Sequence, residues 1–247
     1  MPDPLPLTDR TRLTRLPGLQ SRDRRTLDAV LDAGLVAHLA GCLDGLPVVL
    51  PVAYARDGDR LLLHGSTGGG LLRHAAAAAP LAVAITLVDG LVFARSLYDS
   101  SMNYRSVVVL GRAAPVPEEE KPAALRTLSE RLMPGRWDEV RPPTRRELAA
   151  TLVLALPLDE VSVKVSTGPP GDSAQPPPDL AGTWAGVLPL RPVAGEPESA
   201  PDVPPGLAVP PSLDRAARRI AAAAGDAAGA GDAGDAARPG GAGGSAG

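Results

Sequence analysis

The chain has 247 residues and a formal net charge of −3, so it lacks the basic footprint of a nucleic-acid-binding protein. Two Trp, three Tyr and one Phe are too few for base-stacking platforms, and a single cysteine excludes an internal disulfide and a cysteine-rich metal site. Hydrophobic residues at 44% can form a core, yet no apolar run approaches the roughly 20 residues needed to span a bilayer. We therefore expect a cytoplasmic protein without nucleic-acid or membrane partners.

The first expected elements are an arm and a helix. Residues 1–19 contain Pro and Arg and are expected to form an N-terminal arm rather than a regular element. Ser21 can cap the helix that follows, and Gly34 is placed to end it. The apolar positions of this helix recur at i, i+3 and i+4, at Leu27, Val30 and Leu31.

Three Asp-Gly dipeptides then separate short apolar runs, which is a strong hairpin signal. They predict that 35–39 pairs with 46–54 across residues 44–45, that 48–54 pairs with 60–63 across 57–58, and that 81–87 pairs with 91–95 across 89–90. This pattern favours an antiparallel meander over an alternating βαβ chain. The Gly run at 68–70 lacks the spacing of a dinucleotide fingerprint.

Helices interrupt and follow the meander. The composition predicts helices over residues 67–79, 118–133 and 145–150. Two further apolar runs, 152–158 and 161–166, complete a sheet of about six or seven strands. That many strands with few helices suits a closed or split barrel, because closure removes exposed strand edges.

The composition changes after residue 168, where Pro-rich stretches predict a long loop before the apolar run at 184–190. We expect one domain over residues 20–192. Residues 193–247 are rich in Pro, Ala and Gly and cannot bury enough apolar surface to fold independently, so we expect a disordered tail.

Four segments carry candidate functional residues. Residues 103–111 are expected to form a strand with Arg105 and Ser106 near its start. Residues 61–73 are expected to run from a strand through a Gly/Ser/Thr turn into a helix. Residues 89–96 lie between them, and 182–189 close the pattern. Over residues 8–192 the chain resembles the FMN-binding split-barrel flavoproteins of the pyridoxamine 5'-phosphate oxidase-like superfamily. It is most similar to the nitroimidazole-reductase-like branch of flavin-nucleotide-binding proteins.

The resemblance implies a mainly β fold with flanking helices, namely an FMN-binding split β-barrel. It also implies a homodimer with one FMN at each of two clefts between subunits. The implied activity is FMN-dependent oxidoreduction of a small substrate, such as a nitroaromatic or heteroaromatic compound. A non-catalytic flavin-binding protein for storage or sensing is the alternative, and haem or deazaflavin could replace FMN on the same barrel.

The residues expected to contact the cofactor come from the four segments above and from the strand 161–166. They are His64, Gly65, Ser66, Thr67, Arg95, Ser96, Asn103, Tyr104, Arg105, Ser106, Lys164 and Trp184. Ser66, Thr67, Arg105 and Ser106 are expected to bind the phosphate. The strand 161–166 resembles a family strand that reads Lys-x-Arg, but Ser166 stands in place of that Arg.

His64 is the histidine within a motif, and we expect it to supply a proton or to position the substrate. The alternative is a strand histidine bonded to a backbone carbonyl. His38 is expected on the core side of its strand, and His74 in the Ala-rich helix. Three scattered histidines and one cysteine offer no zinc-ligand spacing, so no metal site is expected beyond a haem ligand.

Overall fold

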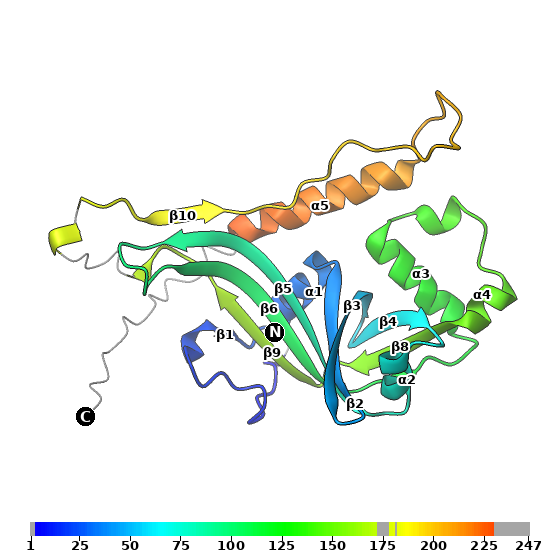
Figure 1. Ribbon diagram of the computed structural model, residues 1–247, viewed down its shortest axis with the longest axis horizontal. Coiled ribbons are helices and arrows are strands. Elements are labelled where there is room, and N and C mark those ends of the chain that lie inside the picture. Colours follow the sequence, from blue (N-terminus) through cyan, green and yellow to red (C-terminus); the bar gives the residue numbers. More distant parts are fainter. Residues whose placement is uncertain (1–2, 172–177, 181, 230–247) are drawn as a thin grey trace.

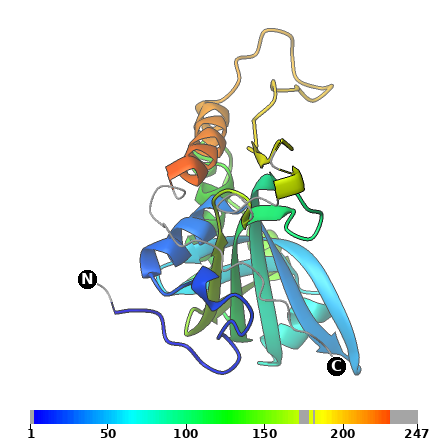
Figure 2. The same cartoon turned by 90° about the vertical axis from the view of Figure 1, so that its left-hand side faces the viewer.

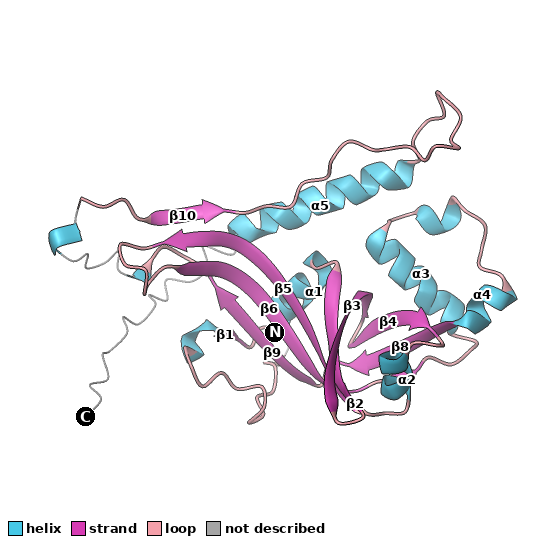
Figure 3. Cartoon of the chain, in the orientation of Figure 1, coloured by secondary structure: helices cyan, strands magenta, loops and turns pink. Residues whose placement is uncertain are grey.

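The computed structural model describes residues 3–171, 178–180 and 182–229, with side chains described up to residue 223. Its described part is a ten-stranded antiparallel sheet that curls into a split barrel with helices around it (Figures 1 and 3). The mainly β fold class expected from the sequence is confirmed. No described helix is long and apolar enough to cross a membrane.

The strands follow one another in the order β1-β9-β6-β5-β2-β3-β4-β8-β7, and β10 pairs with β5 off this path. Their bounds are β1 Gln20–Ser21, β2 Val36–Leu43, β3 Leu46–Asp57, β4 Arg60–Ser66, β5 Pro80–Phe93, β6 Ser101–Arg112, β7 Ala114–Pro115, β8 Thr151–Pro157, β9 Glu160–Ser166 and β10 Gly186–Pro189. The helices are α1 Arg24–Ala33, α2 Gly70–Ala76, α3 Lys121–Leu132, α4 Arg145–Ala150 and α5 Pro211–Gly229. Short 3₁₀ turns lie at Pro17–Leu19, Arg136–Asp138 and Pro178–Leu180.

The long strand β3 links the two halves of the sheet, because its first part pairs with β2 and its last four residues pair with β4. Both of these hairpins turn at the Asp-Gly dipeptides that the sequence indicated, and Gly45 and Gly58 adopt the positive φ that such turns require. The first two hairpin predictions are therefore confirmed.

The main core fills the inside of the barrel. Inward-facing residues of the strands pack there against α1 at one side and α2 at the other. The fully buried members include Leu27, Leu31, Leu39, Tyr54, Leu61, Leu63, Ile85 and Leu154. A second, smaller cluster lies under α3, where Ala124 and Leu128 cover Ala55, Leu62 and Val153 of the sheet. The sheet is therefore packed on its inner face, while α3 covers the part of its outer face formed by the end of β3, by β4 and by β8.

The third hairpin prediction is wrong. Residues 80–93 form one continuous strand, β5, that pairs along its length with β6, with a β-bulge between Val88 and Gly90. Gly90 does not adopt a positive φ, so Asp89-Gly90 cannot form the tight turn that the dipeptide favours. Asp89 instead pairs with an arginine of β6, and the chain turns later, over residues 94–100.

Helix starts differ from expectation in ways that capping explains. Asp23, not Ser21, caps α1, since its carboxylate accepts a hydrogen bond from the Arg25 amide at 2.9 Å. The Gly run delays α2 to Gly70, and the three Glu residues precede α3 instead of forming its first turn. The α4 prediction is confirmed, and Thr144 and Glu147 form a capping box at its start.

The structure differs from the expectation of a disordered tail over Pro211–Gly229, which forms α5 (Figure 1). The composition argument concerned independent folding, whereas α5 lies against the body through polar contacts. Ser212 and Arg215 both contact Glu139, and Arg219 reaches the ends of α1 and α3. Residues 230–247, which belong to the same prediction, lie outside the described part of the chain.

The N-terminal segment packs on the body although it is largely irregular. Leu5 and Thr11 are buried, at 6% and 1% exposure. Glu160 of β9 accepts a hydrogen bond from the Thr8 hydroxyl at 2.8 Å and pairs with Arg10 at 3.0 Å. The segment is thus tied to the β9 side of the barrel, where β1 also pairs.

Candidate functional site

Strand β6 presents two different faces. Asn103, Arg105, Val107 and Val109 are buried, whereas the residues between them are half-buried. Because side chains alternate along a strand, the Asn103 and Arg105 side chains lie on the barrel side, and those of Tyr104 and Ser106 on the outer side. The motif expected to act as one phosphate anchor is therefore divided between two faces of the sheet.

The outer face carries a row of polar side chains across three neighbouring strands. Ser106 lies directly opposite Thr86 of β5 on one side and Lys164 of β9 on the other. The Lys164 ammonium lies 5.3 Å from the centroid of the Tyr104 ring, a cation–π contact on the same face. Among the described residues no carboxylate forms an ion pair with Lys164. This polar row, Thr86, Ser106, Lys164 and Tyr104, thus holds one cation and several hydroxyl groups.

Arg105 faces the opposite way and has a carboxylate partner. Its Nε and Nη2 donate hydrogen bonds to Asp89 Oδ2 and Oδ1 at 2.9 and 2.8 Å. Both side chains are nearly buried, at 8% and 13% exposure. This bidentate geometry makes a strong, charge-assisted contact. The positive charge that the sequence assigned to a phosphate is neutralised within the fold.

Asn103 and Ser166 are engaged with the backbone near the end of β6. The Asn103 side-chain amide donates a hydrogen bond to the Gly168 carbonyl at 3.0 Å. The Ser166 hydroxyl donates to the Met102 carbonyl at 3.4 Å. These contacts connect β6 to the end of β9 and to the segment that follows it.

His64 lies on β4, opposite Val153 of β8, on the strand face that carries Leu62. Burial lowers the pKa of its imidazole, so the neutral form is favoured at neutral pH. Its Nδ1 atom is buried and has no hydrogen-bond partner. Nδ1 therefore makes no hydrogen bond to a backbone carbonyl of the described residues.

The turn after β4 is compact and exposed. Ser66 Oγ accepts a hydrogen bond from the Gly68 amide at 3.2 Å, and the Thr67 amide donates to the Ala150 carbonyl at 3.1 Å. A Cβ on Gly65 would collide with the Leu72 side chain, so glycine is what lets α2 pack on the end of β4. The Ser66 and Thr67 side chains are exposed.

Three other expected residues lie at the far end of the β5–β6 ribbon. Ser96 Oγ donates to Asp99 Oδ2 at 2.7 Å and accepts from the Asp99 amide, which orders the turn that also contains Arg95. Trp184 precedes β10 and is 69% exposed, with its ring 6.1 Å from that of Phe93. Trp184 therefore packs beside the ribbon and does not plug the barrel end.

The structure thus brings Tyr104, Ser106 and Lys164 together and adds Thr86, which the sequence reasoning missed. The sequence did carry a signal for Thr86, because its hydroxyl is the single one in the otherwise apolar run 81–88. The row lies on β5, β6 and β9, whereas the other expected residues lie elsewhere: residues 64–67 on β4 and the turn after it, Arg95 and Ser96 in the turn after β5, and Trp184 before β10. His38 is exposed on β2 and pairs with Ala84, so its expected place on the core side is wrong.

The outer sheet face around the polar row is apolar and exposed. Val36, Val49 and Val88 are 48%, 62% and 43% exposed. Figure 2, which turns the view by 90°, shows the blue strands β2 and β3 at one edge of the molecule and the helices α1 and α5 at the opposite side. No group of three or more His, Cys, Asp or Glu residues in the described ranges could hold a metal ion.

Comparison with known proteins gives consistent findings. Residues 23–165 match the profile of the pyridoxamine 5'-phosphate oxidase family. The chain is similar to the FAD- and haem-binding protein from Mycobacterium smegmatis, with 44% identity over 81% of this chain and 97% of that one, at a TM-score of 0.77. It is also similar to the flavocytochrome Anf3 from Azotobacter vinelandii, with 38% identity over 84% and 96% of the two chains and a TM-score of 0.76. No relative was found among curated proteins.

Proposed function

Since the chain belongs to the pyridoxamine 5'-phosphate oxidase family, we propose that it is a flavin-binding redox protein that takes FAD and also binds haem. Two relatives support this proposal by what they bind: one is an FAD- and haem-binding protein, and the other is a flavocytochrome. We propose FAD in place of FMN, which the sequence resemblance implied, because the FAD- and haem-binding relative is 44% identical to this chain over 81% of its length.

The observation that carries the flavin assignment is the polar row on the outer sheet face. A flavin nucleotide brings phosphate oxygens that need a cation and hydroxyl donors. Lys164 supplies the cation without a described carboxylate partner, and Ser106 and Thr86 lie in register beside it. We assign the phosphate contact to Lys164, with Ser106 and Thr86 as hydroxyl donors, and not to Arg105, whose charge Asp89 neutralises.

The same face can hold the apolar part of a flavin. Tyr104 and Val88 follow the polar row on the outer side of the sheet, and Val36 and Val49 extend the apolar surface. We propose that a second copy of the chain covers this exposed apolar face in a homodimer and excludes water from the flavin. When bound, the flavin supplies hydride or electron transfer, and the protein binds and orients it.

His64 fits a metal-ligand role by its chemistry. A haem iron takes a neutral imidazole nitrogen, and burial keeps the His64 imidazole neutral with Nδ1 unengaged. We assign His64 as the haem ligand. His38, which is exposed, serves as the control position in the test below. If haem is not held there, we propose that His64 positions the substrate, one of the two roles that the sequence resemblance implied, because its neutral imidazole is suited to accept a proton and not to supply one. The proposed activity is oxidoreduction of a small-molecule substrate. The alternative function is storage or sensing of flavin without turnover.

The test is the absorption spectrum of the full chain after incubation with FAD, FMN or haemin and removal of the unbound cofactor. We expect a retained two-band flavin envelope with FAD and a Soret band with haemin. The Soret band should be lost in His64→Ala and kept in His38→Ala. A protein that stays colourless after every incubation would contradict the proposal. Turnover of NAD(P)H with a nitroaromatic or quinone acceptor then separates an oxidoreductase from a flavin-storage protein.

A further inference from the structure

A cavity of ≈ 410 Å³ lies between the edge of β5, the end of α1, the segment after β10, and α5. Its size is in the range of small-molecule sites. The residues that matter for its chemistry are Ala33, Leu87, Arg105, Leu190, Arg191 and Ala223. Apolar walls with a few charged groups are typical of pockets for small organic molecules.

The cavity exists because the edge of β5 is left open at this point. β2 pairs with β5 only up to Ala84, and β10 pairs with it only from Gly90 onward. In the described part of the chain, residues 85–89 therefore have no strand on that side, although the Asp89 carbonyl accepts a hydrogen bond from the Leu190 amide at 3.0 Å. The cavity runs along residues 86–89 of this open edge. An unpaired strand edge presents backbone N–H and C=O groups that a ligand can use.

Arg105 brings donors to the cavity that the fold does not use. Its residue exposure is only 6%, and a guanidinium has five N–H groups. The two hydrogen bonds to Asp89 use one N–H of Nε and one of Nη2, and no other hydrogen bond of this side chain is present among the described residues. Asp89 neutralises the charge of Arg105, so this guanidinium offers further hydrogen-bond donors to an anion, and Arg191 supplies the unbalanced positive charge.

The charge balance of the cavity favours a monoanion. Arg105 and Arg191 contribute two positive charges and Asp89 one negative charge, so its lining carries a net charge of +1. Arg191 is exposed and has no carboxylate partner in the described ranges. Leu87, Leu190 and Pro192 give the apolar surface that an organic body would cover.

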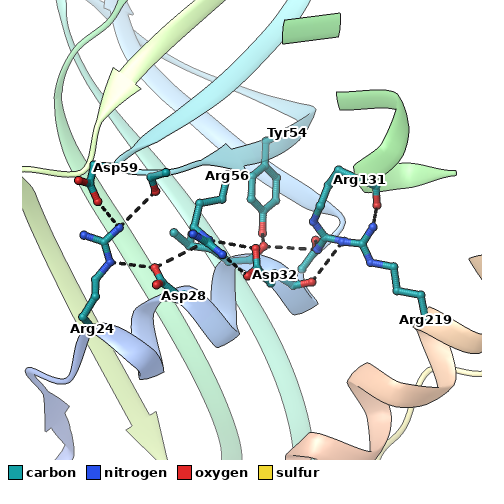
Figure 4. A network of polar contacts seen from close by, with 11 residues as sticks. Arg24, Asp28, Asp32, Tyr54, Arg56, Asp59, Arg131 and Arg219 are labelled. Atoms are coloured by element: carbon teal, nitrogen blue, oxygen red, sulfur yellow. Dashed lines mark hydrogen bonds and ion pairs between the residues drawn. The ribbon is translucent and has the colours of Figure 1, made fainter. Parts of the chain in front are cut away.

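Helix α5 forms one wall and is held in place by an arginine network (Figure 4). Arg219 donates to the carbonyls of Glu130 and Arg131 at the end of α3, and to that of Asp32 near the end of α1. Arg131, itself buried, donates to the carbonyls of Leu31 and Gly34. The two guanidinium groups therefore satisfy carbonyl groups at two helix ends and fix α5 over them.

We propose that this cavity is a second ligand site, which binds a small amphipathic organic monoanion with its charged group at Arg105 and Arg191. The apolar body of the ligand lies against Leu87 and Leu190 under α5. Thr86 and Val88 line both this cavity and the proposed flavin site, but the charged groups are separate, because the Arg105 side chain lies on the opposite face of β6 from Ser106. Its cations are Arg105 and Arg191, whereas the cation of the proposed flavin site is Lys164.

The test uses calorimetric titration of the full chain with 8-anilinonaphthalene-1-sulfonate, an aromatic monoanion, and with uncharged N-phenyl-1-naphthylamine. We expect saturable binding of the anion that Arg191→Gln weakens by about tenfold, the effect of losing a charged hydrogen bond. Arg191→Gln should leave binding of the uncharged probe unchanged. The matched control Arg145→Gln removes an exposed arginine on α4 and should change neither titration.

Two cavity-filling variants complete the test of the site. Two are used because a single filling substitution could perturb folding. Ala223→Phe fills the space from α5, and Leu190→Trp fills it from the segment after β10. In a folded variant, both probes should lose binding while the FAD content stays that of the parent protein. Unchanged probe binding in a folded filling variant, equal effects of Arg191→Gln and Arg145→Gln, or no saturable binding by the parent chain would overturn the proposal. Because FAD content is measured separately, a failed flavin assignment would be recognised on its own.

Discussion

The Asp89 carboxylate accepts two hydrogen bonds from the Arg105 guanidinium, at 2.9 and 2.8 Å, across the β-bulge of β5. The two residues are 16 positions apart in the chain and lie almost out of solvent. The pair explains why Asp89-Gly90 is not a turn. It also explains why Arg105 is not the cation that the polar row offers to a phosphate.

Arg105→Ala should destabilise the fold, because it leaves the Asp89 carboxylate nearly buried without its cation. We expect a loss of about 3–5 kcal/mol in the free energy of unfolding, as for other broken buried pairs. Urea denaturation of the variant and of the parent chain measures this loss. The double variant Asp89→Leu/Arg105→Met removes both charges and should lose much less. An Arg105→Ala variant as stable as the parent would show that the pair does not stabilise this edge.

Arg219→Ala should loosen α5, because its guanidinium contacts carbonyl groups on α1 and α3. Hydrogen bonds of a charged group contribute about 1.5–3 kcal/mol, so amide exchange in α5 should become about 10- to 100-fold faster. Hydrogen–deuterium exchange of residues 211–229 measures this change. The matched control is Arg218→Ala, an exposed neighbour on the same helix, which should exchange as the parent does. If amide exchange in α5 were equally fast in Arg219→Ala and Arg218→Ala, the Arg219 contacts would not be what holds α5 in place.

His64 should make stability depend on pH. Burial lowers its pKa from the usual 6.5 in the folded state, so the unfolded chain binds the proton more tightly. The stabilisation is therefore complete above about pH 6.5 and is lost as the pH falls toward the lower, folded-state pKa. Thermal melts between pH 8 and 5 should show this loss for the parent chain and a smaller one for His64→Gln. The control His38→Gln keeps His64, so its melting temperature should fall with decreasing pH as that of the parent chain does.

Much of the fold could be predicted from local signals. Asp44-Gly45 and Asp57-Gly58 form the indicated hairpins, since each turn needs only its own two residues and alternating neighbours. Asp89-Gly90 gives the same local signal but lies in a bulge, because its partner is supplied by β6. Likewise, α5 depends on Glu139, Glu130 and Asp32, which no window of its own sequence contains.

The candidate site was predictable in composition but not in arrangement. The sequence indicated Tyr104, Ser106 and Lys164, and the structure places these three on one sheet face. It could not indicate that Arg105 faces the other way with a carboxylate, since that depends on the strand register and on the bulge. Thr86 was missed for the same reason, because its place opposite Ser106 follows from the β5–β6 register.

The central claim is that Lys164 anchors a flavin phosphate on the outer sheet face. The most direct measurement is a titration of the flavin-free full chain with FAD, for the parent, for Lys164→Ala and for the control Arg145→Ala. We predict that Lys164→Ala weakens FAD binding by about 1.5–3 kcal/mol, the range for hydrogen bonds to charged groups, while Arg145→Ala binds as the parent does. FAD affinity that is unchanged in Lys164→Ala would contradict the account.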